Sequence, residues 1–165
     1  MWRSMIVAAV VGIAPAAWAQ VPAGGPEAMP FDIPYGTPIS LADARRVAAA
    51  AEAEATLHHW KMAIAIVEPS GDLVFYEKMP DTQYSAVLAS QAKARAAATY
   101  RRATKVFQGM IDGGHPYQLS LPGMAGAAGG VPIVVGGRMI GAIGIGGGSS
   151  DQDDFAATMG AKSLE

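Results

Sequence analysis

The fold is decided by the stretch Val131-Pro-Ile-Val-Val-Gly-Gly-Arg-Met-Ile-Gly-Ala-Ile-Gly-Ile145. Two apolar runs rich in valine and isoleucine are joined there by Gly136-Gly137, and a two-residue Gly-Gly link is a strong signal of a β-hairpin. A second hairpin is predicted upstream, where the runs 62–68 and 73–79 flank a Pro-Ser-Gly-Asp turn at 69–72. The chain therefore contains two predicted hairpins.

Helical patterns surround these hairpins over four segments: 40–57, 83–103, 105–111 and the residues from Asp151 onward. Ser40 and Asp43 resemble a capping box, Gly113-Gly114 form a helix stop, and Ser149-Ser150 can cap the last helix. The predicted order is α-ββ-αα-ββ-α. Hairpins separated by helices favour an α/β (α+β) domain, with one antiparallel or mixed sheet flanked by helices.

The first 38 residues are predicted to precede the domain. Residues 1–19 fit a secretory signal peptide, with a positive start, an apolar run over 5–14 and a small-x-small site at Ala17-Trp18-Ala19. The apolar run is too short to span a bilayer as a mature helix. Residues 20–38 form a Pro/Gly-rich linker, for which a peptide-docking tail is the alternative. We therefore expect a periplasmic or secreted protein whose domain spans residues 39–165.

The composition excludes several classes of function. Removing the first 19 of 165 residues leaves 146, enough for one domain with a real core. Removing Arg3 with them leaves 11 basic and 14 acidic residues, a balance that gives no overall attraction to nucleic acid or to an anionic membrane. The chain has no cysteine. Disulfides, thiolate catalysis and cysteine metal sites are therefore excluded.

The segment Gly141-Ala-Ile-Gly-Ile-Gly-Gly-Gly-Ser-Ser150 joins a predicted strand to a predicted helix. It lacks the lysine of a P-loop and the glycine spacing of a dinucleotide site, so a nucleotide site is disfavoured. Two interpretations remain open. The glycines allow close backbone packing, or the free N–H groups near Gly146, Gly147 and Ser149 bind a carboxylate.

Five cations occur within thirteen residues of the long helix and its C-terminal end: Lys93, Arg95, Arg101, Arg102 and Lys105. At helical spacing they cannot all converge, so some belong to a solvated surface. The functional alternative is that at least one of them anchors a ligand carboxylate.

Three histidines are the only imidazoles: His58, His59 and His115. Adjacent histidines at a helix end point in different directions and do not form a chelating pair. Surface exposure is the default interpretation, and haem ligation by one of them is the alternative. The run Asp151-x-Asp153-Asp154 lacks a calcium-loop pattern and is expected to complement the helix dipole. No metal site is predicted.

Several blocks in order resemble one known family: Ala63-Ile-Ala-Ile-Val-Glu-Pro-Ser-Gly-Asp-Leu-Val74, Ser85, Ala92-Lys93-Ala94, Arg101-Arg102-Ala103-Thr104, Gly129-Gly-Val-Pro-Ile-Val-Val-x-Gly137, Ile140-Gly-Ala-Ile-Gly-Ile145 and Ser149-Ser-Asp-Gln-Asp153. This pattern is similar to the GlcG/HbpS family, also called haem-degrading or haem-binding, which includes the PduO C-terminal domain. The resemblance covers about residues 39–162. It implies a profilin-like domain with a sheet of about five strands, assembly into homo-oligomers, and haem as a possible cofactor.

The sequence and the resemblance together predict an exported protein that binds haem or another small ligand, in haem or iron handling or in redox sensing. The expected pocket lies between the long helix and the glycine-rich segment. Lys93 and Arg102 are expected to anchor a carboxylate or propionate, and His59 is the first candidate axial ligand, with His115 the second. The alternatives are a periplasmic enzyme acting on a small organic acid through Lys93 or His115, and an accessory protein that binds a partner.

Overall fold

The structure, a computed structural model, describes residues 31–165. The predicted signal peptide and most of the predicted linker lie outside the described residues. The elements are α1 (Leu41–Leu57), β1 (Ala63–Val67), β2 (Leu73–Lys78), α2 (Ser85–Tyr100), α3 (Thr104–Asp112), the 3-10 helix η1 (Pro116–Ser120), β3 (Gly130–Val135), β4 (Arg138–Gly146) and α4 (Ser150–Lys162). This order confirms the prediction α-ββ-αα-ββ-α.

The four strands form one antiparallel sheet in the order β2-β1-β4-β3. The expectation of about five strands was wrong. The segment before α1 also runs beside the start of β4, but it makes a single isolated bridge, between Tyr35 and Met139. Pro34 and Pro38 have no N–H group to donate, so this segment cannot extend the ladder as a full strand.

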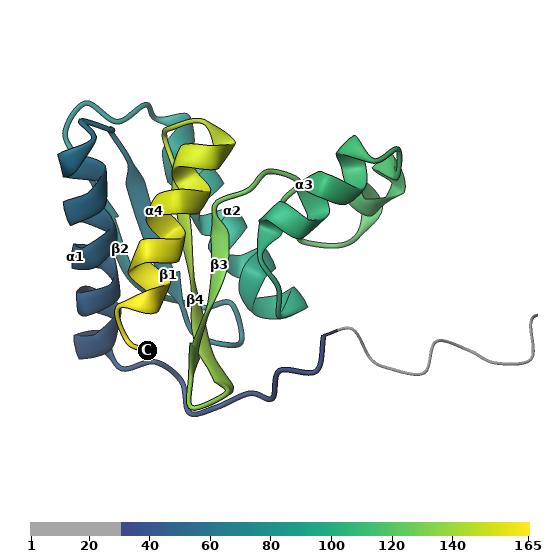
Figure 1. Ribbon diagram of the computed structural model, residues 1–165, viewed down its shortest axis with the longest axis horizontal. Helices are drawn as coiled ribbons and strands as arrows, with labels where there is room; N and C mark the ends of the chain where they lie inside the picture. The colour runs from purple at the N-terminus through teal and green to yellow at the C-terminus, as the bar shows by residue number, and fades with distance from the viewer. Residues whose placement is uncertain (1–30) are drawn as a thin grey trace, which may run out of the picture.

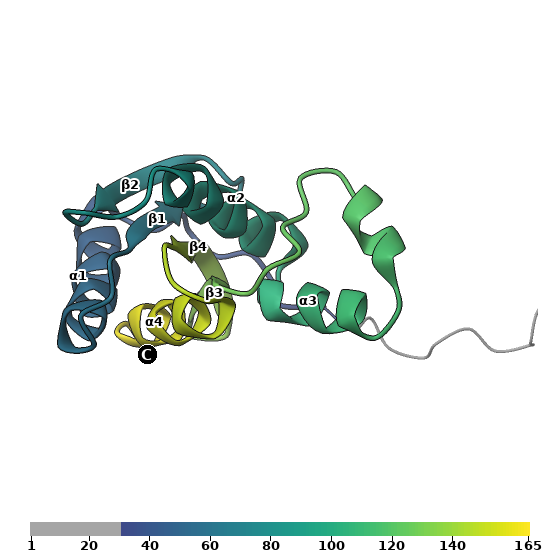
Figure 2. The same ribbon diagram turned by 90° about the horizontal axis from the view of Figure 1, so that it is seen from above.

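Helices cover both faces of the sheet (Figures 1 and 2): α1 and α4 lie on one face, and α2 lies on the other. The alternation along β1 explains the difference between the two layers. Ile64 and Ile66 pack in the larger core with α1 and α4, whereas Ala65 and Val67 face the alanines of α2. Large side chains thus fill one layer, and small side chains bring α2 close to the strands on the other.

Glycines in the strands set the distance between α2 and the sheet. A methyl group at Gly144 would collide with the carbonyl of Ser90 and the backbone of Ala94, and one at Gly130 would collide with the carbonyl of Lys93. The glycine-rich segment therefore serves close backbone packing, which is one of its two interpretations from the sequence.

Residues 104–126, which we call the arm, project from the body of the domain (Figure 1). The arm is attached at its base. Phe107 is completely buried there, the Thr104 hydroxyl accepts a hydrogen bond from the Gly130 N–H at 2.9 Å, and the Gln108 side chain accepts one from the Ala128 N–H at 2.9 Å. The rest of the arm is largely exposed and carries apolar side chains: Val106, Tyr117, Leu119 and Leu121.

Substitution of Gly144 by alanine tests the close packing of α2. The added methyl group has no free space, so we expect Gly144→Ala to lower the free energy of unfolding by at least about 2 kcal/mol. Gly109→Ala is the matched control, because Gly109 lies in α3 with open space around it, and helix propensity should raise stability by roughly 0.5–1 kcal/mol. Urea denaturation measures both. Equal and small changes in the free energy of unfolding of the two variants would mean that Gly144 does not set the distance between α2 and the sheet.

Candidate functional site

A buried ion pair joins the two helical layers at one end of the sheet. The Nζ atom of Lys93 on α2 lies 2.7 Å from Oδ2 of Asp153 on α4, and the two side chains are 8% and 3% exposed. Gly129 lies against both side chains, since a Cβ there would stand 2.7 Å from Cβ of Asp153 and 3.1 Å from Nζ of Lys93. A side chain at this position would therefore collide with both members of the pair.

The glycine-rich segment donates one N–H group to the same carboxylate. The Gly148 N–H donates to Oδ1 of Asp153 at 2.9 Å. Ser149 is the N-cap of α4, with a capping box in which its N–H donates to Oε1 of Gln152 at 2.8 Å. The structure thus brings Lys93 and the N-terminus of α4 together, as the sequence suggested. The anion that they bind is the chain's own Asp153.

The remaining two glycines of the predicted anion site have backbone roles. Gly146 ends β4 beside α2. Gly147 has a φ of 129°, and a methyl group there would collide with the carbonyl of Lys61. Its own carbonyl accepts a hydrogen bond from Nε2 of Gln83 at 3.3 Å.

Burial dominates the electrostatics of Asp153. It raises the pKa of the Asp153 carboxyl, while Lys93 and the Gly148 N–H act in the opposite direction. A buried charge without its partner is strongly destabilising, so each member of the pair depends on the other. In this arrangement the Lys93 ammonium is engaged within the domain, and its role as a ligand anchor stays a prediction.

Arg102 lies elsewhere, at the base of the arm, beyond the C-terminus of α2. That helix ends at Tyr100 and is followed by its C-cap Arg101, whose backbone is left-handed with a φ of 53°. The Arg102 guanidinium lies between two aromatic rings, with Cζ 3.1 Å from the centre of the Phe31 ring and 5.0 Å from that of Phe107. Lys93 and Arg102 therefore belong to separate environments in the described structure.

The other cations of the group also have partners. Nζ of Lys105 lies 3.1 Å from Asp154 and 3.8 Å from Asp151, which links the base of the arm to α4. Nε of Arg95 donates to the carbonyl of Gly71 at 3.1 Å. These contacts join elements distant in the sequence, so helical spacing alone did not predict them.

His59 terminates α1. Its φ is 57°, its N–H donates to the carbonyl of Thr56, and the Trp60 N–H donates to the carbonyl of Ala55. This is the Schellman pattern, in which the residue after the C-cap takes a left-handed backbone. The exposed His59 side chain projects from a position whose backbone role is to end the helix.

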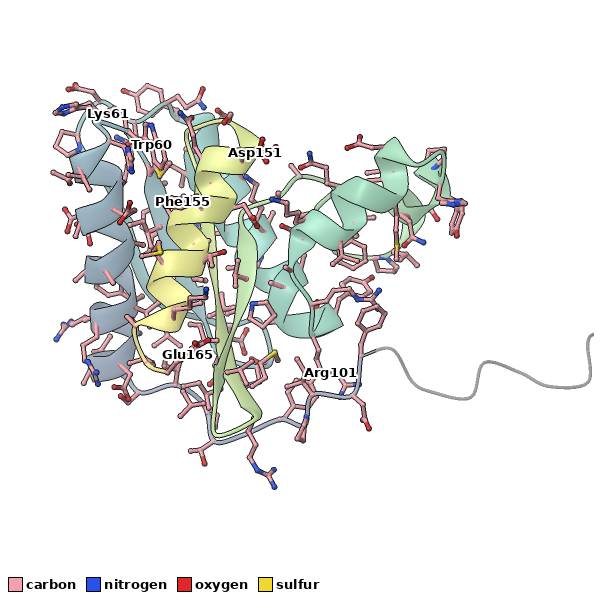
Figure 3. The ribbon with its side chains drawn as sticks, in the orientation of Figure 1. Trp60, Lys61, Arg101, Asp151, Phe155 and Glu165 are labelled. Carbon is pink, nitrogen blue, oxygen red and sulfur yellow. The ribbon has the colours of Figure 1, made fainter. Side chains whose placement is uncertain are left out.

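His58 belongs to an aromatic cluster that the sequence analysis missed. Its ring stacks on Trp60 at 4.5 Å between centroids, and Phe155 of α4 meets both rings edge-on at about 6 Å. Nε2 of His58 also lies 3.0 Å from Glu54. Figure 3 shows Trp60 and Phe155 beside each other near the start of α4. The His-His-Trp sequence at a helix end was the available signal.

His115 lies on the arm, immediately before η1. Its side chain is exposed, and its ring centroid is 5.8 Å from that of Tyr117. Tyr117 and Leu119 are 63% and 60% exposed, and Leu121 is 37% exposed. An imidazole and several apolar side chains thus face solvent on one projecting element.

A small cavity lies apart from all of these residues. It has a volume of about 220 Å³ and is lined by Asp43, Arg46, Val135, Ile140 and Leu164. Enclosing pockets for drug-sized ligands usually measure about 300–1,000 Å³. Within residues 31–165 no three metal-ligating side chains gather into a cluster, and no helix there is long and apolar enough to cross a membrane.

Substitutions of Lys93 and Asp153 test whether the two charges depend on each other. Asp153→Asn leaves the buried Lys93 ammonium without an anionic partner, so we expect a loss of about 3–5 kcal/mol in the free energy of unfolding. The double variant Lys93→Met/Asp153→Asn should recover most of this loss, because the asparagine oxygen can still accept the Gly148 N–H. Additive effects in denaturant unfolding would show that the pair is not coupled.

The variant Lys93→Met alone should be sensitive to pH. Without Lys93 the pKa of the buried Asp153 carboxyl rises further, because only burial and the Gly148 N–H remain. As pH rises, the Asp153 carboxyl loses its proton in the unfolded chain at a lower pH than in the folded chain. The free energy of unfolding therefore falls above the unfolded pKa of about 3.9, by up to about 1.36 kcal/mol per pH unit. The loss in free energy of unfolding relative to the parent protein, measured by urea denaturation, should be small near pH 4 and larger at pH 7. A loss that does not change with pH would contradict this prediction.

His59→Gly separates the backbone role of His59 from any role of its imidazole. Glycine takes the left-handed conformation without strain, so the variant should be as stable as the parent or slightly more stable. His59→Val is the comparison, because a β-branched residue is strained there, with an expected loss of about 1–2 kcal/mol. Thermal unfolding measures both. Equal stability of the two variants would mean that the cap geometry is unimportant.

Comparisons with known proteins agree with this fold. The family model described as haem degrading protein HbpS-like matches residues 39–162. Protein GlcG of Escherichia coli K12 is 37% identical over 102 residues, which cover 62% of this chain and 76% of GlcG.

Solved structures of other proteins have the same fold. A double mutant of Streptomyces reticuli HbpS has a TM-score of 0.72 at 25% identity, covering 87% of this chain and 99% of that one. The structure of a PduOC–haem complex has a TM-score of 0.70 at 22% identity, covering 78% and 96%. The chain, matched by the family model over nearly all of its described domain, belongs to the HbpS-like haem-degrading protein family.

Proposed function

We propose that this protein is an exported haem-binding protein that holds haem on the surface of the arm, with His115 as the iron ligand. The observation that carries the proposal is the exposed imidazole of His115 among the apolar side chains of Tyr117, Leu119 and Leu121. Membership of the HbpS-like family supports haem as the ligand, and so does the haem complex of PduOC, which has the same fold.

The residues of the arm fit the chemistry of haem. A haem macrocycle needs apolar contacts on its faces and a side chain that can bind iron, and histidine is a common axial ligand. Tyr117 and Leu119 are too exposed to form a complete pocket in one copy of the chain. A second copy would cover the other side of the haem, so the proposal includes a homo-oligomer.

The other two histidines are less suited to the role. Nε2 of His58 is engaged with Glu54, and its ring is stacked on Trp60. His59 is exposed, but it extends from the left-handed end of α1. Bound haem would supply an iron centre for redox sensing or iron handling, and the signal-peptide pattern of residues 1–19 supports a periplasmic or secreted location.

The alternative is a periplasmic enzyme or accessory protein acting on a small organic acid. It would require the Lys93 ammonium as acid or base, or Arg102 as an anchor. Lys93 is buried against Asp153, and Arg102 is covered by Phe31. Both contacts would have to break before a ligand could reach either cation, so the arm is the stronger candidate.

A haemin titration followed at the Soret band tests the proposal. We expect saturable binding by the parent protein, and His115→Ala should weaken it at least tenfold because the iron loses its ligand. His58→Ala and His59→Gly are matched controls on exposed imidazoles and should bind like the parent. Circular dichroism checks that each variant is folded.

Two results would overturn the proposal. Absence of a saturable Soret shift in the parent would remove haem as the ligand. A loss of binding in His59→Gly with none in His115→Ala would move the site from the arm to the end of α1. Sedimentation of the haem-free and haem-loaded protein tests the oligomer, which we expect to be larger than a monomer when haem is bound.

A further inference from the structure

Residues 31–39, which we call the strap, lie extended along the base of the domain (Figure 1). Three backbone hydrogen bonds of 2.8–2.9 Å hold the strap to β4, and all of them involve Pro34 or later residues: Gly36 N–H to Met139, Met139 N–H to Pro34 and Ile39 N–H to Ile140. The part before Pro34 is therefore held in another way.

Two adjacent arginines hold that part. The Arg102 guanidinium lies against the face of the Phe31 ring, 3.1 Å from its centre. Arg101 donates to the carbonyl of Ile33 at 3.1 Å and lies 5.3 Å from the centre of the Tyr35 ring. Alternate residues of an extended segment thus meet the arginines at the end of α2. Figure 3 shows Arg101 beside the strap, at the base of the arm.

These two arginines differ from Lys93 and Lys105, each of which has a carboxylate partner. In residues 31–165 no carboxylate lies within 4.0 Å of Arg101 or Arg102. A guanidinium has five N–H donors, and Arg102 uses its Nε to reach the Tyr100 carbonyl at 3.3 Å. Burial lowers the pKa of Arg102, which agrees with a cation covered by rings and without an anion.

We propose that Arg101, Arg102 and Phe107 form a binding site for small aromatic carboxylates, and that the strap is its displaceable cover. Phe31 supplies a ring but no acceptor. A ligand that carries both a ring and a carboxylate can replace the Phe31 ring and also accept bidentate hydrogen bonds from a guanidinium. Such a ligand satisfies donors that the strap leaves free. This site is separate from the arm surface around His115.

Binding of 2-naphthoate to the purified protein, measured by calorimetry, tests the proposal. Phe31→Ala removes the covering ring and should tighten binding by about threefold to tenfold. Arg102→Gln removes the anion partner and should weaken binding at least tenfold. The matched control is Arg45→Gln, because Arg45 is an exposed arginine on α1. It should leave the affinity unchanged. The uncharged 2-naphthylmethanol should bind at least tenfold more weakly than 2-naphthoate.

Two results would overturn the proposal in whole or in part. Equal affinities of the parent, Arg102→Gln and Arg45→Gln proteins would overturn the site. Unchanged or weaker binding in Phe31→Ala would overturn the role of the strap as a cover. Thermal unfolding checks that Arg102→Gln is folded, and Arg102→Lys gives a second variant that keeps the charge but loses the planar donor pair. Haem is absent from this experiment, so its outcome is independent of the haem titration.

Discussion

The ion pair between Lys93 and Asp153 is the contact on which the arrangement of the domain depends. It connects α2 on one face of the sheet with α4 on the other, at the end where β4 leads into the glycine-rich segment. A buried charge destabilises the fold strongly unless its partner lies at hydrogen-bonding distance. The separation of 2.7 Å between the Lys93 ammonium and the Asp153 carboxylate must therefore be kept, and this restrains both helices. Gly129 is required at the same point, because a side chain would collide with Asp153 and with the Lys93 ammonium.

The same contact explains why the most conspicuous motif of the sequence is not an open anion site in this structure. A lysine, a helix N-terminus and free N–H groups are the features that bind anions, and the chain does assemble them. The carboxylate that occupies them comes from the fourth residue of the helix itself, since Asp153 accepts from both Lys93 and the Gly148 N–H. The candidate surfaces for external ligands consequently lie elsewhere, on the arm and beneath the strap.

The architecture was predictable because it follows from local signals. Gly136-Gly137 specifies a hairpin, and alternating small and large residues in β1 match helices on both faces. Two features were not predictable in this way. Nothing in the sequence marks Arg101 as a left-handed residue, so the predicted helix over 83–103 ended three residues too late. The predicted fifth strand is absent because prolines remove donors from the segment before α1, which makes a single bridge to β4.

The site was harder to predict than the fold, because the partners of charged residues are set by tertiary packing. Sequence spacing placed Lys93 and Arg102 on one helix, but it did not show that one meets Asp153 and the other meets Phe31. The same holds for His58, whose stacking on Trp60 requires the sharp end of α1. The sequence identified His115 as a candidate ligand. Its exposed apolar neighbours could not be predicted, because their exposure depends on the projection of the arm from the domain.

The most direct test of this account is a crystal structure of the protein grown with haemin. We predict haem on the arm, with His115 bound to iron, apolar side chains of a second copy on the opposite side, and the Lys93–Asp153 pair unbroken. Haem in the glycine-rich segment, with a propionate on Lys93 and Asp153 displaced, would contradict it.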